Sequence, residues 1–367
     1  MEVISLKPFE DRIKAIRHKL EEEKVDAAYI SFRYNMRYLS GFTGDAGALL
    51  ITGSEAILFT DGRYTEQASS QAPDFRVIET KLDKDVVADT VSSLGIKSLT
   101  FESEHVTFAS WENMTKRFKD TRLVPASGWV EKLRAKKTPE EIQAIRKAAK
   151  LADDAFSMVV SSIRPGVSER DVALELEFTM RKMGSEGVAF PIIAVSGARS
   201  SLPHGEPGDK KIEPGDFVTV DFGAVWSGYV SDCTRTFVVE PLEERHREIY
   251  EVVRRAQQAG LRAVRAGVKA SEVDAAGRKV IEEAGYGQYF GHGIGHGVGL
   301  QVHESPRLGQ KSEDILEPGM VVTVEPGVYI PGFGGVRIED LVVVGDDGPE
   351  VLTSFPKDLK VLGGLER

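Results

Sequence analysis

The chain is poor in cysteine, in long apolar stretches and in clustered positive charge. Its 367 residues include one cysteine, Cys233, which excludes an internal disulfide and fits a reducing cytoplasm. No run of eighteen apolar residues occurs and the N-terminus lacks the apolar core of a signal peptide, so we expect a cytoplasmic protein that does not span a membrane. A net charge of −10 without a basic tract disfavours nucleic acid as a partner.

One pattern occurs twice in the second half of the chain. Residues 213–223 read E-P-G-D-F-V-T-V-D-F-G, and residues 317–327 read E-P-G-M-V-V-T-V-E-P-G. Pro-Gly predicts a turn and Val-Thr-Val predicts a strand, which ends at a carboxylate in both copies, Asp221 and Glu325. The repeat therefore indicates two related hairpins.

A second acid follows each copy on the next predicted strand, Asp232 in the first and Glu339 in the second. Any one of these acids could be an ordinary solvated side chain at a strand end, but four in a repeated frame indicate a shared site. Converging carboxylates resist ionisation unless a cation neutralises them. Such a site suits Mg, Ca or Mn, and an added imidazole moves the choice toward Mn, Co, Fe or Zn.

Histidines are clustered near the second copy. Three of the chain's seven lie in G-H-G-I-G-H-G-V-G-L-Q-V-H-E, as His292, His296 and His303. The intervening glycines disfavour a helix, and no Glu follows His292, so the His-Glu-x-x-His zinc pattern is absent. A loop followed by a strand is the better interpretation, and we expect at least one of the three to bind metal. A fourth histidine, His204, lies in the turn-rich segment S-S-L-P-H-G.

These segments resemble the metallopeptidases of the creatinase and methionine-aminopeptidase fold, often called pita-bread. Within them the chain is most similar to the Xaa-Pro peptidases, aminopeptidase P and prolidase. The resemblance implies an α+β catalytic domain with a pseudo-two-fold repeat over residues 138–367. The matching segments follow the family's order: S-G-A-R-S-S-L-P-H-G, V-D-F-G-A-V-W-S-G-Y-V-S-D-C-T-R-T-F, G-H-G-V-G-L-Q-V-H-E-S-P, T-V-E-P-G-V-Y-I and G-V-R-I-E-D.

The resemblance also implies a dinuclear centre of two divalent metal ions, with Mn2+ expected and Co2+, Zn2+ or Fe2+ as alternatives. Asp232 and Glu339 would bridge the two ions. A water or hydroxide between the ions would be the nucleophile, and Glu325 would carry its proton to the leaving amine. The implied metal ligands are Asp221, Asp232, His296, Glu325 and Glu339.

Further residues would surround the ions and the substrate. His204 and His303 match the family's substrate-facing histidines, which hold the scissile carbonyl and stabilise the oxyanion. His292, Thr234 and Arg337 would orient the ligands. Candidates for the wall of a proline pocket are Phe190, Tyr229 and Tyr329.

The pattern of residues 1–130, the first half of the chain, predicts a separate α/β domain. Its segments N-M-R-Y-L-S-G-F-T-G and T-D-G-R-Y-T-E-Q-A resemble the creatinase-type N-terminal domain of the aminopeptidase P and prolidase group, which implies a homodimer. The run Thr138-Pro139-Glu140-Glu141 predicts the capped start of a helix that reaches about residue 158. We expect helices near 8–23, 64–72, 84–94 and 107–119, and strands at Ala27–Ser31, Leu49–Thr52, Ile57–Thr60, Phe75–Glu79 and Leu99–Glu102.

The expected substrates are peptides with proline at the second position. Aminopeptidase P removes the first residue from longer peptides, whereas prolidase cleaves only the dipeptide. Two N-terminal segments, F-T-G-D-A-G and T-D-G-R-Y-T-E-Q-A, favour the aminopeptidase. A dipeptidase must also bind the free proline carboxylate, for which Arg307 and Arg337 are candidates.

Other functions fit the chain less well. Methionine aminopeptidases share the ligands but usually lack the N-terminal domain. Creatinase has both domains but lacks the metal ligands. A non-catalytic binding protein on this fold normally shows eroded ligands, and all of the implied ligand positions here hold a ligating residue.

Overall fold

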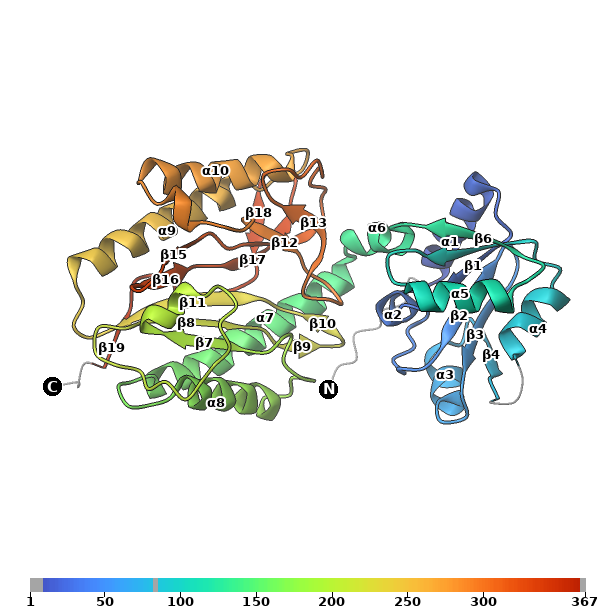
Figure 1. Ribbon diagram of the computed structural model, residues 1–367, viewed down its shortest axis with the longest axis horizontal. Helices are drawn as coiled ribbons and strands as arrows, with labels where there is room; N and C mark the ends of the chain where they lie inside the picture. The colour runs from blue at the N-terminus through green and yellow to red at the C-terminus, as the bar shows by residue number, and fades with distance from the viewer. Residues whose placement is uncertain (1–8, 82–84, 364–367) are drawn as a thin grey trace. The chain divides into compact units, whose positions relative to one another are not determined.

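The computed structural model describes residues 9–81 and 85–363 (Figure 1). The chain divides into two compact units, an N-terminal unit that ends at Arg134 and a C-terminal unit that continues from Ala135. Each unit has its own sheets and its own apolar core. Among the described residues, no helix combines the length and the apolar character that crossing a bilayer requires.

In the described part of the N-terminal unit, six strands form one sheet in the order β4-β3-β2-β1-β5-β6, and β2 runs antiparallel to both of its neighbours while the other pairs are parallel. The strands are β1 Ala27–Ile30, β2 Ala48–Thr52, β3 Ala56–Thr60, β4 Arg76–Glu79, β5 Ser98–Glu102 and β6 Arg122–Ala126. The helices are α1 Phe9–Glu23, α2 Arg33–Ser40, α3 Thr65–Gln71, α4 Val86–Ser93, α5 Phe108–Arg117 and α6 Trp129–Ala135.

Every helix and strand expected in the first half is present with shifted ends, and residues 8 and 84 of two expected helices lie outside the described residues. Helices α2 and α6 and strand β6 were not expected. Helix α2 is short and ends at Gly41, whose φ of 79° lies in the left-handed region that glycine adopts readily. The residue before α2 is Phe32, which makes no side-chain capping hydrogen bond, so the sequence gives no start signal for this helix.

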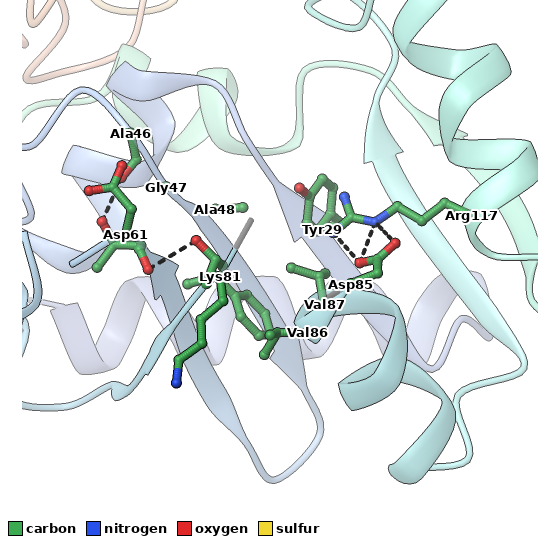
Figure 2. A pocket seen from close by; sticks show the side chains of 13 residues that line it. Tyr29, Ala46, Gly47, Ala48, Asp61, Lys81, Asp85, Val86, Val87 and Arg117 are labelled. Atoms are coloured by element: carbon green, nitrogen blue, oxygen red, sulfur yellow. Dashed lines mark hydrogen bonds and ion pairs between the residues drawn. The ribbon is translucent and has the colours of Figure 1, made fainter. Parts of the chain in front are cut away.

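A pocket of about 500 Å³ opens in the N-terminal unit at the carboxyl-terminal ends of β1, β3 and β4 (Figure 2). Its wall includes Tyr29, Lys81, Asp85 and Arg117. Asp85 accepts hydrogen bonds from Nε of Arg117 at 2.6 and 2.7 Å, so these two charges neutralise each other. None of the predicted site residues lines this pocket.

The C-terminal unit consists of two halves with the same layout. The first half has helices α7 Pro139–Val159 and α8 Glu169–Lys182 against a sheet in the order β19-β11-β8-β7. Its strands are β7 Ile193–Ser196, β8 Phe217–Phe222, β11 Cys233–Val239 and β19 Val361–Leu362, with a small hairpin of β9 Val225–Trp226 and β10 Tyr229–Val230. Short 3-10 turns occupy η1 Val160–Ser162 and η2 Gly197–Ser201.

The second half has helices α9 Glu244–Ala263 and α10 Ala270–Glu283 against a sheet in the order β13-β12-β14-β17-β18. Figure 1 shows α7 and α8 on one side of the strands and α9 and α10 on the other. The strands are β12 Gly295–Gly297, β13 Glu304–Leu308, β14 Val321–Val324, β17 Asp340–Val344 and β18 Pro349–Val351, with a hairpin of β15 Gly327–Ile330 and β16 Gly334–Arg337 and the turn η3 Gly287–Tyr289. This arrangement is the predicted pita-bread architecture.

The start of α7 follows the predicted capping box. The Thr138 hydroxyl accepts the N–H of Glu141, and the Glu141 carboxylate accepts the N–H of Thr138 at 2.8 Å. Phe156 of this helix is fully buried against Phe222 and Phe355, with ring centroids 4.5 and 4.8 Å away. Truncation of such a buried ring lowers the stability of a protein by about 3–5 kcal/mol. The Phe156 contacts therefore contribute strongly to the apolar core of the first half.

The repeated pattern forms matching strands. In the first copy Asp221 lies within β8 and pairs with Thr234 of β11. In the second copy the strand ends one residue before Glu325, because Pro326 has no N–H to donate to a ladder. Asp232 and Glu339 occupy the same place in the two halves, directly before β11 and β17.

Candidate active site

The predicted acids and one imidazole converge inside the C-terminal unit. Nε2 of His296 lies 3.2 Å from Oε1 of Glu325 and 3.7 Å from Oδ2 of Asp232. Asp232, His296 and Glu339 each offer a ligand atom, and these atoms all lie within 4.8 Å of one another. Residues distant in the sequence therefore form a donor set compact enough for a metal ion.

The glycines around His296 let two backbones approach closely. A Cβ on Gly295 would lie 2.0 Å from the Thr323 carbonyl oxygen, and one on Gly297 would lie 2.3 Å from that of Ser305. Strand β12 can therefore lie directly between its neighbours, which brings His296 beside the end of β14. The predicted loop and strand are confirmed, and the histidine cluster is not helical.

His296 is oriented by its own backbone and by a neighbouring threonine. Its Nδ1 lies 3.1 Å from the Gly297 carbonyl oxygen, so Nε2 is directed at the acids. Its backbone N–H donates to Oγ1 of Thr323 at 3.1 Å, and the same hydroxyl donates to Oε1 of Glu325 at 3.0 Å. Thr323 thus connects the His296 backbone and the Glu325 carboxylate, a role the sequence interpretation missed.

The two carboxylate oxygens of Asp221 differ in their hydrogen bonding. Its Oδ2 accepts a hydrogen bond from Nη2 of Arg337 at 2.7 Å. Its Oδ1 is buried and has no hydrogen-bond partner among the described residues. Since buried polar atoms normally have partners, this oxygen fits a role as a metal ligand.

Arg337 and Thr234 form hydrogen bonds with the acids. Arg337 donates from Nε to Oγ1 of Thr234 at 3.0 Å, and Thr234 donates to Oε2 of Glu339 at 2.7 Å. Arg337 also donates to the Tyr329 hydroxyl at 2.9 Å. Only 3% of Arg337 is exposed. Its guanidinium is therefore already hydrogen-bonded to protein groups, which disfavours the additional expectation that Arg337 binds substrate.

The central carboxyls are proton-binding groups in the absence of metal. Burial, followed by the charges of neighbouring acids, raises the pKa of Asp232 and Glu339 well above the usual range. Burial also raises the pKa of Asp221, although Arg337 opposes the shift. A divalent cation would remove this cost because it replaces the protons as the neutralising charge.

Glu325 behaves differently from the other acids. Burial would raise its pKa, but the hydrogen bond and charge of His296 outweigh burial and lower the pKa of Glu325 to about 2. Burial lowers the pKa of His296, yet Glu325 raises it by more. Glu325 is therefore ionised near neutral pH.

The remaining histidines lie around this cluster. His303 is exposed, and its ring packs edge-on against His296 with a centroid distance of 4.3 Å. His204 is exposed in the loop after η2. His292 is half-buried, with Nε2 at 2.9 Å from the Tyr329 hydroxyl. Burial lowers the pKa of both His292 and His303, with His296 adding to the shift of His303.

Two of the candidate pocket residues already have hydrogen-bond partners. The Tyr329 hydroxyl contacts Arg337 and His292, and burial raises its pKa to about 12. The Tyr229 hydroxyl donates to Oε1 of Glu141 at 2.5 Å. Cys233 is buried next to the Glu339 carbonyl oxygen, so it packs as a small side chain.

The fold and the acid–histidine site together define a two-domain metallopeptidase. Residues 143–346 match the metallopeptidase family M24, and residues 12–136 match the Creatinase/Prolidase N-terminal domain. The chain belongs to metallopeptidase family M24, in the group of Xaa-Pro peptidases. The resemblance expected from the sequence is thereby confirmed.

Solved relatives share the whole fold. A structure of an Xaa-Pro dipeptidase from Bacillus anthracis is 47% identical, with a TM-score of 0.94 over 96% of this chain and 100% of that chain. An X-Pro aminopeptidase from Thermotoga maritima MSB8 is 38% identical, with a TM-score of 0.89 over 95% and 99% of the two chains. A curated Xaa-Pro dipeptidase from Pyrococcus furiosus is 39% identical over 95% of this chain and 99% of its own length.

Proposed function

We propose that this chain is a dinuclear metal-dependent exopeptidase that cleaves Xaa-Pro dipeptides. Two divalent ions, with Mn2+ as the first choice, would be held by Asp221, Asp232, His296, Glu325 and Glu339, since an oxygen-rich site with one imidazole suits that metal. The bound ions would polarise the scissile carbonyl and activate a water near neutral pH. The relatives named Xaa-Pro dipeptidase support this choice of reaction.

Glu325 would act as the proton carrier. Its carboxylate stays ionised because His296 holds the pKa near 2 against the effect of burial. The Thr323 hydroxyl donates to Oε1 and fixes the direction of the carboxylate. An ionised, oriented carboxylate can take a proton from the attacking water and return it to the leaving amine.

His303 and His204 would bind the carbonyl side of the substrate. Burial and His296 lower the pKa of His303, which favours a neutral imidazole that can donate one hydrogen bond to a developing oxyanion. The loop that carries His204 is held at the Pro203 carbonyl by Arg337, at 3.2 Å. Both histidines are exposed, so a substrate can reach them.

The position of Arg307 is the observation that carries the dipeptidase assignment. Arg307 is the cross-strand partner of His296 in the β12–β13 pairing, so the two side chains leave the same face of the sheet. Arg307 is exposed, and among the described residues its side chain has no ion pair, while its backbone N–H donates to Asp314. Its guanidinium is therefore available for the free carboxylate of a carboxyl-terminal proline.

An Xaa-Pro aminopeptidase is the second candidate. It is favoured by the F-T-G-D-A-G segment of the N-terminal unit and by the similar X-Pro aminopeptidase from Thermotoga maritima MSB8. For that enzyme the carboxylate contact would be absent, because the peptide continues after proline. The cytoplasmic location and the homodimer stay predictions.

A paired assay distinguishes the two candidates. Mn2+-loaded protein is given an Xaa-Pro dipeptide and the matching Xaa-Pro-Xaa tripeptide, with Glu325→Gln as the inactive reference. A dipeptidase should cleave only the dipeptide, and Arg307→Ala should lower its kcat/KM about ten- to a hundredfold, because a hydrogen bond to a charged group contributes about 1.5–3 kcal/mol.

The matched control is Arg255→Ala, which removes an exposed arginine from α9, a helix that contributes none of the site residues. Its kcat/KM should equal that of the unaltered protein. Cleavage of the tripeptide between Xaa and Pro, with no effect of Arg307→Ala, would instead establish the aminopeptidase. Turnover of neither substrate with metal bound would refute both candidates.

A further inference from the structure

A buried carboxylate lies directly beside the exposed His303. Glu304 is the next residue, and only 5% of its side chain is exposed. Its Oε1 accepts the backbone N–H of Gln301 at 2.9 Å. The N–H of Gly299 donates to the carbonyl oxygen of Gln301 at 3.0 Å, which closes a tight turn. We call residues 299–303 the His303 loop, and this loop folds around the Glu304 carboxylate.

His303 depends on this loop for its position. Among the described residues no side-chain hydrogen bond of His303 is present, and its ring contact is with His296 alone. An exposed imidazole with one edge-on contact is not fixed by packing. The backbone of the loop must therefore place the ring, and Glu304 holds that backbone.

A buried lysine supplies the opposite charge. Nζ of Lys137 lies 3.5 Å from Oε2 of Glu304, and 1% of the lysine side chain is exposed. The backbone N–H of Lys137 donates to the Gly319 carbonyl oxygen at 2.9 Å, and Nζ donates to the Ala135 carbonyl oxygen at 3.1 Å. Hydrogen bonds thus fix both the backbone and the side-chain nitrogen of Lys137, which lies directly before the N-cap of α7.

The loop fits closely over the carboxylate. A Cβ on Gly299 would lie 2.5 Å from Oε2 of Glu304, so this position accepts only glycine without displacement. The Gly299 carbonyl oxygen accepts the N–H of Val230 in β10 at 2.9 Å, which holds the loop from its other side. A shift of the Glu304 carboxylate would therefore move the loop and the imidazole at its end.

We propose that the Lys137–Glu304 ion pair is a positioning element that holds His303 in its working orientation. This inference rests on the proposed function, in which His303 contacts the substrate. Neither Lys137 nor Glu304 would touch the substrate or the ions. The lysine places a positive charge beside the buried carboxylate, and a carboxylate oxygen accepts the Gln301 N–H more strongly than a neutral amide oxygen would.

Glu304→Gln tests the proposal because it keeps the shape of the side chain and removes its charge. Its kcat/KM for the Xaa-Pro dipeptide should fall about ten- to a hundredfold, since a displacement of about 1 Å can cost that much. Both metal ions per chain should be retained when counted by elemental analysis. Lys137→Met should give a similar loss, and Lys137→Arg should restore most of the activity.

A double-mutant cycle with His303→Ala separates positioning from simple stabilisation. If the ion pair acts through His303, adding Glu304→Gln to His303→Ala should change kcat/KM less than twofold. The matched control is Asp153→Asn, a buried carboxylate of α7 that accepts the Ser354 N–H and lies outside the site. It should lower stability and leave kcat/KM unchanged.

Hydrogen exchange gives a readout that does not need turnover. Amides of residues 299–303 should exchange at least tenfold faster in Glu304→Gln than in the unaltered protein, because the Gln301 N–H loses its charged acceptor. If the unaltered protein cleaves no Xaa-Pro substrate, the proposed function fails while the exchange result still decides the role of the pair. Unchanged exchange, full activity of Glu304→Gln, or an equal loss in the His303→Ala background would each overturn the inference.

Discussion

The two halves of the C-terminal unit place their acids in the same frame but hold them by different means. In the first half the Asp221 carboxylate faces Arg337, a guanidinium that stays charged. In the second half the Glu325 carboxylate faces His296, an imidazole that can lose its proton. The repeated backbone determines where the acids lie, and the neighbouring cation determines how each of them titrates.

Residues of one half also form hydrogen bonds with residues of the other half. Arg337 belongs to β16 of the second half yet pairs with Asp221 of the first, and it also bonds Thr234 of β11. The Glu339 N–H donates to the Thr234 carbonyl oxygen at 3.2 Å. Neither half can therefore complete the site alone, which explains why the duplicated pattern serves one centre.

The largest expected effects are those of substitutions at Glu325 and at Asp221, which should differ in kind. Glu325→Gln should lower kcat/KM for Xaa-Pro substrates about 10²–10⁴-fold, because it removes the proton carrier. Asp221→Asn removes a proposed metal ligand and should also lower turnover. Its distinguishing effect is a loss of about 3–5 kcal/mol in the stability of the metal-free protein, because it leaves the buried Arg337 without its carboxylate. Turnover assays and urea unfolding in chelator measure the two effects.

Glu325→Gln should cost less stability than Asp221→Asn, since His296 can become neutral when its partner is removed. Asp153→Asn serves as the control for a buried acid outside the site. Equal losses of stability in Glu325→Gln and Asp221→Asn would contradict the claim that the two acids are held by different kinds of cation.

The second prediction concerns the acids that both halves share. Asp232 and Glu339 have a raised pKa in the metal-free fold, first because of burial. Between their ordinary pKa and the raised one, the folded state binds more protons than the unfolded state. Stability is therefore fully present below the ordinary pKa and is lost as pH rises, by up to about 1.4 kcal/mol per pH unit for each group.

Urea unfolding of the chelated protein at several pH values from 4 to 8 measures this slope. Mn2+ should remove it, because the cation replaces the protons and stabilises the ionised form. The double variant Asp232→Asn/Glu339→Gln should also lack the slope. Parallel pH dependences in the variant and the unaltered protein would show that other groups are responsible.

The sequence predicted the donor set better than its surroundings. The acids were singled out because a repeated frame of strand and turn carries them. The residue pattern alone indicated only that one of three clustered histidines binds metal, and the family resemblance selected His296. The contacts of Thr323 and Tyr329 were missed because they join residues from separate strands. A residue pattern shows which side chains share a strand face, but partners across strands depend on register and packing.

The N-terminal unit shows the same limit for the fold. Five strands were predicted nearly to their ends, as were the short helices α3 and α4, whereas helix α2 and strand β6 were not. Strand β6 contains Pro125, which disfavours a strand in the sequence pattern, and α2 follows Phe32, which does not mark a helix start. The capping box at Thr138 is local in sequence, which is why the start of α7 was predicted correctly.

The smallest expected effect compares two threonines at the same position of the repeat. Thr219 is buried and bonds Thr236 and the Gly335 carbonyl oxygen, whereas Thr323 bonds Glu325 and the His296 N–H. Thr219→Val should therefore lower stability by about 1–3 kcal/mol with kcat/KM within twofold. Thr323→Val should lower kcat/KM about tenfold, the cost of one hydrogen bond to a charged group. Chemical unfolding and steady-state kinetics on both variants test this comparison. A loss of activity in Thr219→Val as large as in Thr323→Val would mean that both threonines contribute equally to catalysis.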